Sequence, residues 1–194
     1  MDTTRIFRAP RATPRLVTGD RLAIVGPSGA GKTALLRRLG EELGAEPLAG
    51  DSPWLDGEST GWEAIRQRLG QGPAAEAASA FCGLGDFLDL PVRCYSTGMR
   101  WRLGFALATA SPPEVLLCDR AMWGGDLAFR ERARQRIERL AARSRVAALV
   151  SGDTAWLERH CNRAVWLDEG EVVREGRAGE VLRAYRAARF AAVA

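Results

Sequence analysis

The stretch Gly26-Pro27-Ser28-Gly29-Ala30-Gly31-Lys32-Thr33 decides the fold of this chain. Its spacing, G-x-x-x-x-G-K-[ST], is that of a phosphate-binding loop. The chain carries 28 Lys and Arg residues, and Lys32 is the only lysine among them. An ammonium is a compact point charge that fits between two phosphates, whereas a guanidinium is a broad planar fork. We therefore interpret Lys32 as a phosphate ligand rather than as an incidental charge in a glycine-rich turn.

The residues on both sides of the loop predict the local structure that such a loop needs. Residues 21–25 form a short apolar run that is typical of a buried strand. Residues 33–39 have helical spacing, and we expect this helix to end near Gly40 or Gly44. A strand, a loop and a helix in this order favour a nucleotide site.

The predicted contacts to the nucleotide come from the whole loop. Backbone N–H groups close around a phosphate at a helix N-terminus, which adds roughly half a positive charge. Lys32 is expected to span the β- and γ-phosphates, and the Thr33 hydroxyl is expected to ligate Mg²⁺. The candidate nucleotide-binding residues of the loop are Gly26, Ser28, Gly29, Ala30, Gly31, Lys32 and Thr33.

Composition limits the class of protein. With 194 residues, 46% of them hydrophobic, the chain is predicted to form one domain with a substantial core. The formal charge is +4, but acidic and basic residues are interspersed. The densest basic stretch, between residues 130 and 145, is interpreted as the solvated face of a helix rather than a surface for nucleic acid or lipid headgroups. We predict no nucleic-acid partner.

The cysteines and the apolar runs indicate the compartment. The cysteines are scattered without metal-ligand spacing, which predicts unlinked thiols in a reducing compartment. No apolar run approaches the length of a membrane span, and the first residues lack a signal-peptide core. We expect a soluble cytoplasmic protein that reaches a membrane only through a partner.

Strand and helix signals alternate along the chain, which predicts an α/β fold with a mostly parallel sheet and ligands at the carboxyl ends of its strands. Before residue 21 we expect one strand at most. After the first helix, the sequence predicts helices at 62–70, 74–90, 96–110, 126–143 and 178–190, strands at 114–119 and 146–151, and a hairpin at 164–173.

A second motif lies at Tyr95-Ser96-Thr97-Gly98-Met99. Ser96 is a natural N-cap and Gly98 allows close approach, so the motif predicts a second anion-binding helix terminus. One chain has little use for two such termini on one nucleotide, unless the second serves a nucleotide held by another subunit. A phosphate loop alone leaves kinases, GTPases and ATPases open, and this motif disfavours most of them.

Residues 95–108 resemble the signature motif of ATP-binding-cassette (ABC) ATPases. The form Tyr-Ser-x-Gly-Met-Arg is similar to that of the subunits that drive capsular and other surface-polysaccharide exporters. The resemblance extends over residues 19 to 187, with further matches at 84–87, 162–167 and 180–186. It implies a P-loop NTPase fold in a single domain over 1–194. The RecA-like core is expected at about 15–50 and 112–187, with a shortened helical subdomain at about 57–111.

The resemblance also implies ligands and partners. Asp119 matches the Walker B aspartate that holds Mg²⁺, and Gly125-Asp126 matches the D-loop that touches an opposing subunit. Lys32 of one chain and Ser96, with Gly98, of another are implied to grip one ATP in a head-to-tail dimer. The implied partners are ATP, Mg²⁺, a second ABC ATPase subunit and a membrane-spanning permease. The resemblance also implies that this chain is peripheral on the cytoplasmic face of the inner membrane.

The chain departs from the family at the residues of hydrolysis. The glutamate that follows the Walker B aspartate is replaced by Arg120, and the switch histidine is replaced by Gly152. Arginine stays protonated and cannot act as a base. Asp153 and Asp126 are possible substitute bases. We predict a chain that binds ATP and hydrolyses it weakly or not at all.

Other family features are shortened or displaced. The interval between Lys32 and Ser96 is short for the family, which puts docking on a permease in question, and the N-terminal antiparallel strands are largely missing. Asp56 is the nearest counterpart of the Q-loop glutamine. Phe7 is the only aromatic candidate before the loop for stacking on adenine, and we interpret it as a packing residue.

Two alternatives to a transporter subunit remain. One is a catalytically inactive, ATP-dependent interaction or regulatory module with no transport role. The other is a small P-loop kinase, which the signature helix disfavours.

Overall fold

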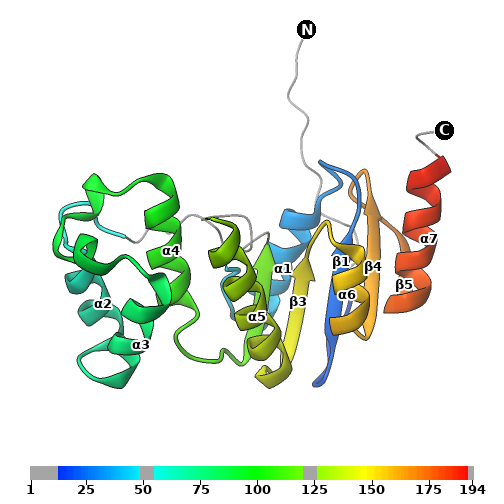
Figure 1. Ribbon diagram of the computed structural model, residues 1–194. Coiled ribbons are helices and arrows are strands. Elements are labelled where there is room, and N and C mark those ends of the chain that lie inside the picture. The colour runs from blue at the N-terminus through cyan, green and yellow to red at the C-terminus, as the bar shows by residue number, and fades with distance from the viewer. Residues whose placement is uncertain (1–12, 49–54, 120–125, 192–194) are drawn as a thin grey trace, which may run out of the picture. The chain divides into compact units, whose positions relative to one another are not determined.

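The structure is a computed structural model that describes residues 13–48, 55–119 and 126–191. The chain divides into two compact units. The sheet unit comprises Met1–Pro47, Glu114–Asp119 and Ser144–Ala194, and the helical unit comprises Leu48–Pro113 and Arg120–Arg143. Figure 1 shows the order of the elements in each unit.

The sheet unit is built on five strands in the order β2-β3-β1-β4-β5. The first four strands in this order run parallel, and β5 pairs with β4 in the antiparallel direction. This confirms the predicted α/β class and its mostly parallel sheet. The strands are β1 (Arg21–Val25), β2 (Val115–Asp119), β3 (Val146–Val150), β4 (Arg163–Asp168) and β5 (Glu171–Arg177).

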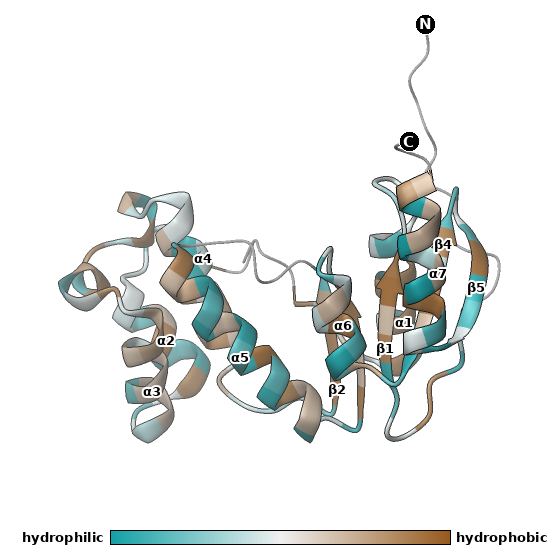
Figure 2. Ribbon diagram, turned by 45° about the vertical axis from the view of Figure 1, so that its right-hand side comes forward, coloured by the Kyte–Doolittle hydropathy of each residue, from teal (hydrophilic) through white to brown (hydrophobic). Residues whose placement is uncertain are grey.

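The three strands β1, β2 and β3 are near-continuous apolar runs, and their side chains are buried almost throughout. Such runs are typical of parallel strands that are covered on both faces. Helix α1 (Lys32–Leu43) contacts β2, while α6 (Thr154–His160) and α7 (Ala178–Ala191) pack on β1 and on each other. Figure 1 shows α6 in front of the sheet and α1 behind it, and Figure 2 shows the hydrophobic colour of β1.

The register of the sheet brings three strand ends together. Val150, the last residue of β3, pairs with Asp119 of β2 on one side and with Ile24 of β1 on the other. The segments that leave β1 and β3 and the carboxylate that ends β2 therefore lie at one edge. This is the edge at which open parallel sheets bind ligands.

In its described residues the helical unit holds four α-helices and two short 3₁₀ turns, and local chemistry marks the starts of several of the helices. A capping box between Thr60 and Glu63 begins α2, and Pro73 occupies the first turn of α3. Asp126 precedes α5, and its side chain accepts the Phe129 N–H at 2.8 Å. The elements are α2 (Gly61–Leu69), α3 (Pro73–Cys82), η1 (Gly85–Asp89), η2 (Val92–Cys94), α4 (Thr97–Ala108) and α5 (Leu127–Arg143).

Two details of the predicted elements change. The helix expected over 74–90 is wrong in its second half, because α3 ends at Cys82, where Gly83 adopts a left-handed conformation with φ 60°. Helix α6 was not predicted. The described residues before β1, 13–20, contain no strand, which is compatible with the expectation of one strand at most.

The structure also tests the predictions about the basic stretch and the cysteines. Helix α5 carries the basic stretch, but the guanidiniums of Arg132 and Arg136 lie over the Phe81 ring, so they are not simply solvated. All four cysteines are free, as predicted. Among the described residues, none of the helices combines the length and apolar character that crossing a bilayer requires.

Candidate nucleotide site

The loop between β1 and α1 has a backbone that only glycine adopts without strain at several positions. Gly26, Gly29 and Gly31 have φ values of 155°, 83° and 90°. A Cβ atom added to Gly26 would lie 2.2 Å from the carbonyl oxygen of Leu167 in β4. The glycines thus allow the chain to turn tightly against the neighbouring strand and to enter α1 from a left-handed residue.

We expect Gly26→Ala to destabilise the fold. The added methyl group would meet a backbone atom of β4, which cannot rotate away, and the positive φ adds strain of about 1–3 kcal/mol. Thermal unfolding should show a fall in Tm on the order of 5–10 °C. The matched control is Gly152→Ala, because no heavy atom lies within 4 Å of the added Cβ atom there. Equal Tm values for the two variants would contradict this account of the loop.

Lys32 lies across the loop that precedes it. Its ammonium donates to the carbonyl oxygen of Gly26 at 2.9 Å and to that of Pro27 at 2.5 Å. The charge is thereby held at the start of α1, where the backbone N–H groups of a first helical turn have no intrahelical partner. A point charge beside such donors is suited to a phosphate group.

Thr33 and Asp119 meet at the same edge of the sheet. The Thr33 hydroxyl donates to Asp119 Oδ2 at 2.6 Å. The other carboxylate oxygen, Oδ1, is buried and has no hydrogen-bond partner among the described residues. A buried oxygen of this kind carries a desolvation cost that a cation, or a water molecule bound to it, offsets. Carboxylate, hydroxyl and water oxygens are ligands of Mg²⁺, so this pair fits the expected metal.

The segment after β3 places Gly152 and Asp153 at this edge. The space around Gly152 is open, since an added Cβ atom would meet no heavy atom within 4 Å. Asp153 caps α6, and its Oδ1 accepts the Trp156 N–H at 2.8 Å. The structure therefore gives Asp153 a structural contact, and its role as a substitute base stays a prediction.

Two further acidic candidates lie in the helical unit. Asp56 forms a turn in which its carboxylate accepts the Glu58 N–H at 3.1 Å and the Ser59 hydroxyl at 2.9 Å. These hydrogen bonds lower the pKa of the Asp56 carboxyl. The bond from the Phe129 N–H likewise lowers the pKa of the Asp126 carboxyl. Asp126, which was considered as a substitute base, therefore lacks the raised pKa that is typical of a general base near neutral pH. The counterpart role of Asp56 for the Q-loop glutamine stays a prediction.

The second motif begins α4 as predicted. Ser96 is the N-cap, and its hydroxyl oxygen accepts the Met99 N–H at 3.2 Å. Ser96 is exposed, and a Cβ atom added to Gly98 would meet only Ser96 Oγ, at 3.9 Å. The start of α4 is thus an accessible helix terminus, which is what the anion-binding prediction requires.

The structure brings part of the predicted site together. The loop, Thr33, Asp119 and Gly152 lie at one edge of the sheet unit, whereas Ser96 and Gly98 lie in the helical unit. Three predicted positions, Arg120, Gly125 and Phe7, are outside the described residues.

Sequence reasoning missed the side chain of Tyr95. Its ring is 3% exposed, and its hydroxyl donates to the carbonyl oxygen of Phe87 at 2.7 Å. Burial raises the pKa of Tyr95 to about 12, so the hydroxyl stays a donor under ordinary conditions. The available signal was an aromatic residue directly before the capping serine.

The strand, glycine loop and helix on a mostly parallel sheet define a P-loop NTPase fold, and solved structures share it. Two dimeric structures of the ABC transporter cassette MJ0796, one in a post-hydrolysis state bound to ADP and Pi, match with TM-scores of 0.62 and 0.63. Each is 20% identical and covers 85% of this chain and 88% of that chain. At this identity the likeness concerns the fold alone.

Relatives in sequence define the family. The O-antigen export system ATP-binding protein RfbE of Yersinia enterocolitica is 37% identical over 187 residues, which cover 82% of this chain and 75% of RfbE. The teichoic acids export ATP-binding protein TagH of Listeria monocytogenes is 30% identical over 185 residues, covering 86% of this chain and 55% of TagH. No family model matches the chain.

The chain therefore belongs to the ATP-binding subunits of ABC transporters, and the predicted family is confirmed. The ABC transporter protein AbcA of Aeromonas salmonicida is also 32% identical over 205 residues, covering 93% of this chain and 65% of AbcA. The chain spans about half the length of the TagH proteins that it matches.

Proposed function

We propose that the chain is the ATP-binding subunit of an ABC exporter of a surface polysaccharide. Two features support this substrate class: relatives named for O-antigen and teichoic acid export, and the Tyr-Ser-x-Gly-Met-Arg form of the second motif. In this proposal the chain lies on the cytoplasmic face of the inner membrane, where it works with a membrane-spanning permease.

The observation that carries the proposal is the contact between Thr33 and Asp119 beside the loop that holds Lys32. Lys32 would bind the β- and γ-phosphates of ATP, and the loop glycines would admit the phosphates close to the backbone. Thr33 and Asp119 would hold Mg²⁺, which neutralises phosphate charge when it is bound. In this assignment the sheet unit carries the RecA-like core, at about 15–50 and 112–187, and residues 57–111 form the helical subdomain.

Ser96 and Gly98 would serve a second molecule. Their helix terminus is exposed and offers a further anion site, while the loop at Lys32 already supplies the donors that one triphosphate needs. A head-to-tail dimer, in which Ser96 of one chain binds the ATP on Lys32 of another, uses both sites. MgATP would then hold the dimer together.

Hydrolysis is proposed to be weak or lost. Arg120 replaces the glutamate that assists the attacking water in the family, and Gly152 offers no side chain to the γ-phosphate. The residues of binding are kept, however, which favours a protein that responds to ATP over one that has decayed at random. Turnover in the assembled transporter would then come from a competent partner site.

The proposal is tested by the oligomeric state of the purified full chain with and without MgATP, measured by sedimentation velocity. We expect a monomer without nucleotide and a dimer with it. Ser96→Arg should abolish the dimer but leave MgATP affinity within about threefold, because a bulky side chain at the cap blocks the partner's phosphate without touching the loop.

The matched control is Ser111→Arg, which adds the same charge to an exposed serine beyond the other end of α4. It should dimerise like the wild type. The proposal is wrong if the chain does not bind MgATP, or if Ser96→Arg dimerises as well as this control.

A further inference from the structure

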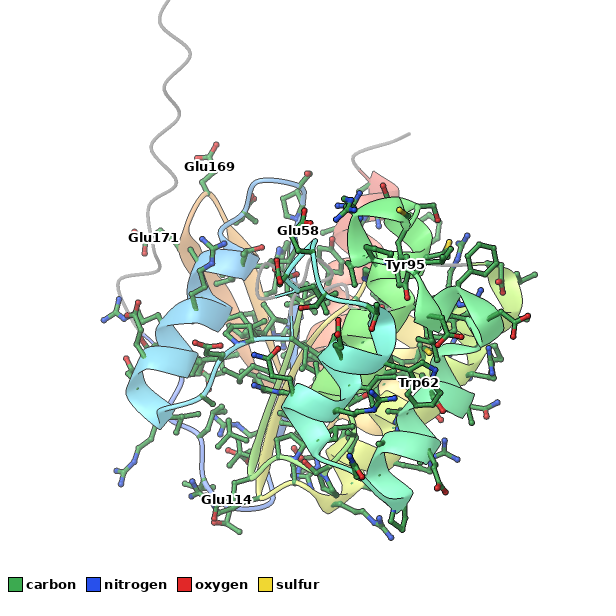
Figure 3. All side chains as sticks on the ribbon, turned by 90° about the vertical axis from the view of Figure 1, so that its left-hand side faces the viewer. Glu58, Trp62, Tyr95, Glu114, Glu169 and Glu171 are labelled. Carbon is green, nitrogen blue, oxygen red and sulfur yellow. The ribbon has the colours of Figure 1, made fainter. Side chains whose placement is uncertain are left out.

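The residue that precedes Ser96 is fixed by its side chain. Tyr95 is labelled in Figure 3. Its ring is buried, and its hydroxyl donates to the Phe87 carbonyl oxygen in η1 at 2.7 Å. Tyr95 directly precedes Ser96, the N-cap of α4. The hydrogen bond therefore joins the 3₁₀ turn η1 to the entry of α4.

Gly61, the first residue of α2, packs against the Tyr95 hydroxyl. A Cβ atom added to Gly61 would be 2.3 Å from Tyr95 Oη and 2.7 Å from Leu88 Cδ2. The hydroxyl thus fills a notch between α2 and η1 that has no room for a methyl group. A side chain held this closely transmits any change in its hydrogen bond to its own backbone.

The backbone before Tyr95 is held independently. The Val92 N–H donates to the Ser59 carbonyl oxygen at 2.9 Å, and the Arg93 N–H donates to that of Gly57, also at 2.9 Å. An ion pair between Arg93 and Glu58 reinforces this contact. The Tyr95 N–H donates in turn to the Val92 carbonyl oxygen at 3.0 Å, so the anchored turn η2 reaches as far as the Tyr95 backbone. The Tyr95 hydroxyl adds a second anchor, from the side chain, at the point where the chain enters α4.

Ser96 depends on the direction in which the chain enters α4. The Tyr95 carbonyl oxygen accepts a bond from Arg100 Nε at 3.3 Å, and the Ser96 carbonyl oxygen accepts the Arg100 N–H at 3.0 Å. The first turn of α4 is therefore oriented by the backbone of Tyr95. Small displacements of a donor from its acceptor weaken a hydrogen bond steeply, so the placement of Ser96 is sensitive to this anchor.

We propose that Tyr95 is a positioning residue: its hydroxyl bond to the Phe87 carbonyl sets the start of α4 so that Ser96 and Gly98 can engage the ATP held by a partner subunit. This inference rests on the proposed function. Tyr95 touches no nucleotide in it and acts through Ser96. The competing role, packing alone, requires the ring but not the hydroxyl.

Tyr95→Phe separates the two roles because it keeps the ring and removes the hydroxyl. We expect MgATP affinity of the monomer to stay within about twofold, since Lys32 and its loop are untouched, while the dimer formed in MgATP dissociates at least about tenfold more readily. Packing alone would lower Tm without weakening the dimer selectively. The matched control is Tyr185→Phe, because the chain has two tyrosines and the other one lies in α7.

A second pair of variants tests the notch. Gly61→Ala should weaken the dimer because its methyl group displaces the hydroxyl, although Gly61 is far from Ser96 in sequence. Adding Tyr95→Phe should restore part of the dimer relative to Gly61→Ala alone, since it removes the closest collision of the new methyl group, the one with Tyr95 Oη. If the double variant dimerises no better than Gly61→Ala alone, the collision with the Tyr95 hydroxyl is not the cause of the weaker dimer.

Hydrogen exchange gives a result even if the chain does not dimerise. In the free monomer, Tyr95→Phe should speed exchange of the Met99 and Arg100 amides, which donate to Ser96 Oγ and to the Ser96 carbonyl oxygen, by at least about tenfold, with core amides of the sheet unit unchanged. The inference is overturned if these amides exchange at the wild-type rate. Failure of the proposed function shows elsewhere, as a wild type that does not bind MgATP or does not dimerise with it.

Discussion

Replacing Lys32 by alanine is expected to lower the affinity for MgATP by a factor between about 30 and several thousand. Truncating one member of a buried, hydrogen-bonded charge pair costs about 2–5 kcal/mol, and each 1.4 kcal/mol is a factor of about ten. The ammonium is already held over the loop by the Gly26 and Pro27 carbonyl groups, so little ordering is needed when a phosphate binds. Isothermal titration calorimetry measures the effect directly.

The control for this variant is Arg37→Ala. Arg37 is an exposed residue of α1, and its loss changes the net charge by the same amount. It should alter the affinity by less than about threefold, because an exposed charge is screened by solvent and salt. If both variants weaken binding equally, the effect of Lys32 is one of net charge and the site is elsewhere.

Lys32→Arg tests the chemical argument for the single lysine. The guanidinium keeps the charge but is planar and broad, so we expect it to recover only a small part of the lost affinity. Because the chain has one lysine, amine-reactive labelling followed by peptide mapping reports on this side chain alone, apart from the N-terminal amine. MgATP should protect Lys32 from the label and leave the N-terminal amine reactive.

The sequence predicts best those parts of the fold that depend on residues close together in the chain. The strand, glycine loop and helix at residues 21–43 follow from apolar runs and from glycines that adopt positive φ. Helix α1 ends at Leu43 with Gly44 in the left-handed conformation, which is the second of the two predicted ends. The Ser96 cap was found for the same reason, since a capping serine bonds within three residues.

What escaped prediction depends on contacts between distant segments or on signals that are short. Helix α6 has 7 residues, too few for helical periodicity to stand out. The break at Gly83 looks like helix in sequence because apolar residues continue beyond it. The role of Tyr95 depends on a carbonyl group of η1 and on the space beside Gly61, neither of which a pattern of residue types contains.

The contact between Thr33 and Asp119 was predicted only in part from the sequence itself. The two residues are far apart in sequence, and β3 separates β2, which Asp119 ends, from β1, which leads through the loop to Thr33 in α1. Only the resemblance to a family placed them together in advance. The cap formed by Asp153 shows the opposite outcome, because a residue considered as a base has its carboxylate bonded to the Trp156 N–H.

The second large effect concerns hydrolysis. We expect the wild-type chain to turn over ATP slowly at best, and Arg120→Glu combined with Gly152→His to raise the rate by about 10²–10⁴, the usual contribution of a general base. Arg120 lies outside the described residues, so its replacement rests on its position directly after Asp119 in the sequence. Gly152 has open space for a new side chain at the edge that also holds the loop and Asp119.

The measurement is steady-state phosphate release at saturating MgATP. It is made on the wild type, on each single variant and on the double variant, which together form a double-mutant cycle. Arg120→Glu alone should recover part of the rate by supplying a base, whereas Gly152→His alone should recover little, because a group that contacts the γ-phosphate cannot replace proton transfer. The control is Arg139→Glu with Gly152→His, which makes the same change of charge on an exposed residue of α5 and should remain inactive.

The outcomes separate two explanations of a slow enzyme. A wild type that hydrolyses ATP as fast as an active double variant would mean that Arg120 and Gly152 do not limit hydrolysis. Another group would then take the proton, and Asp153 would be the first to test. A double variant that binds MgATP and dimerises but stays inactive would mean that the attacking water is misplaced for a further reason. In that case ATP would act on this chain through binding alone. The loop around Lys32 and the cap at Ser96 would then account for its response to ATP.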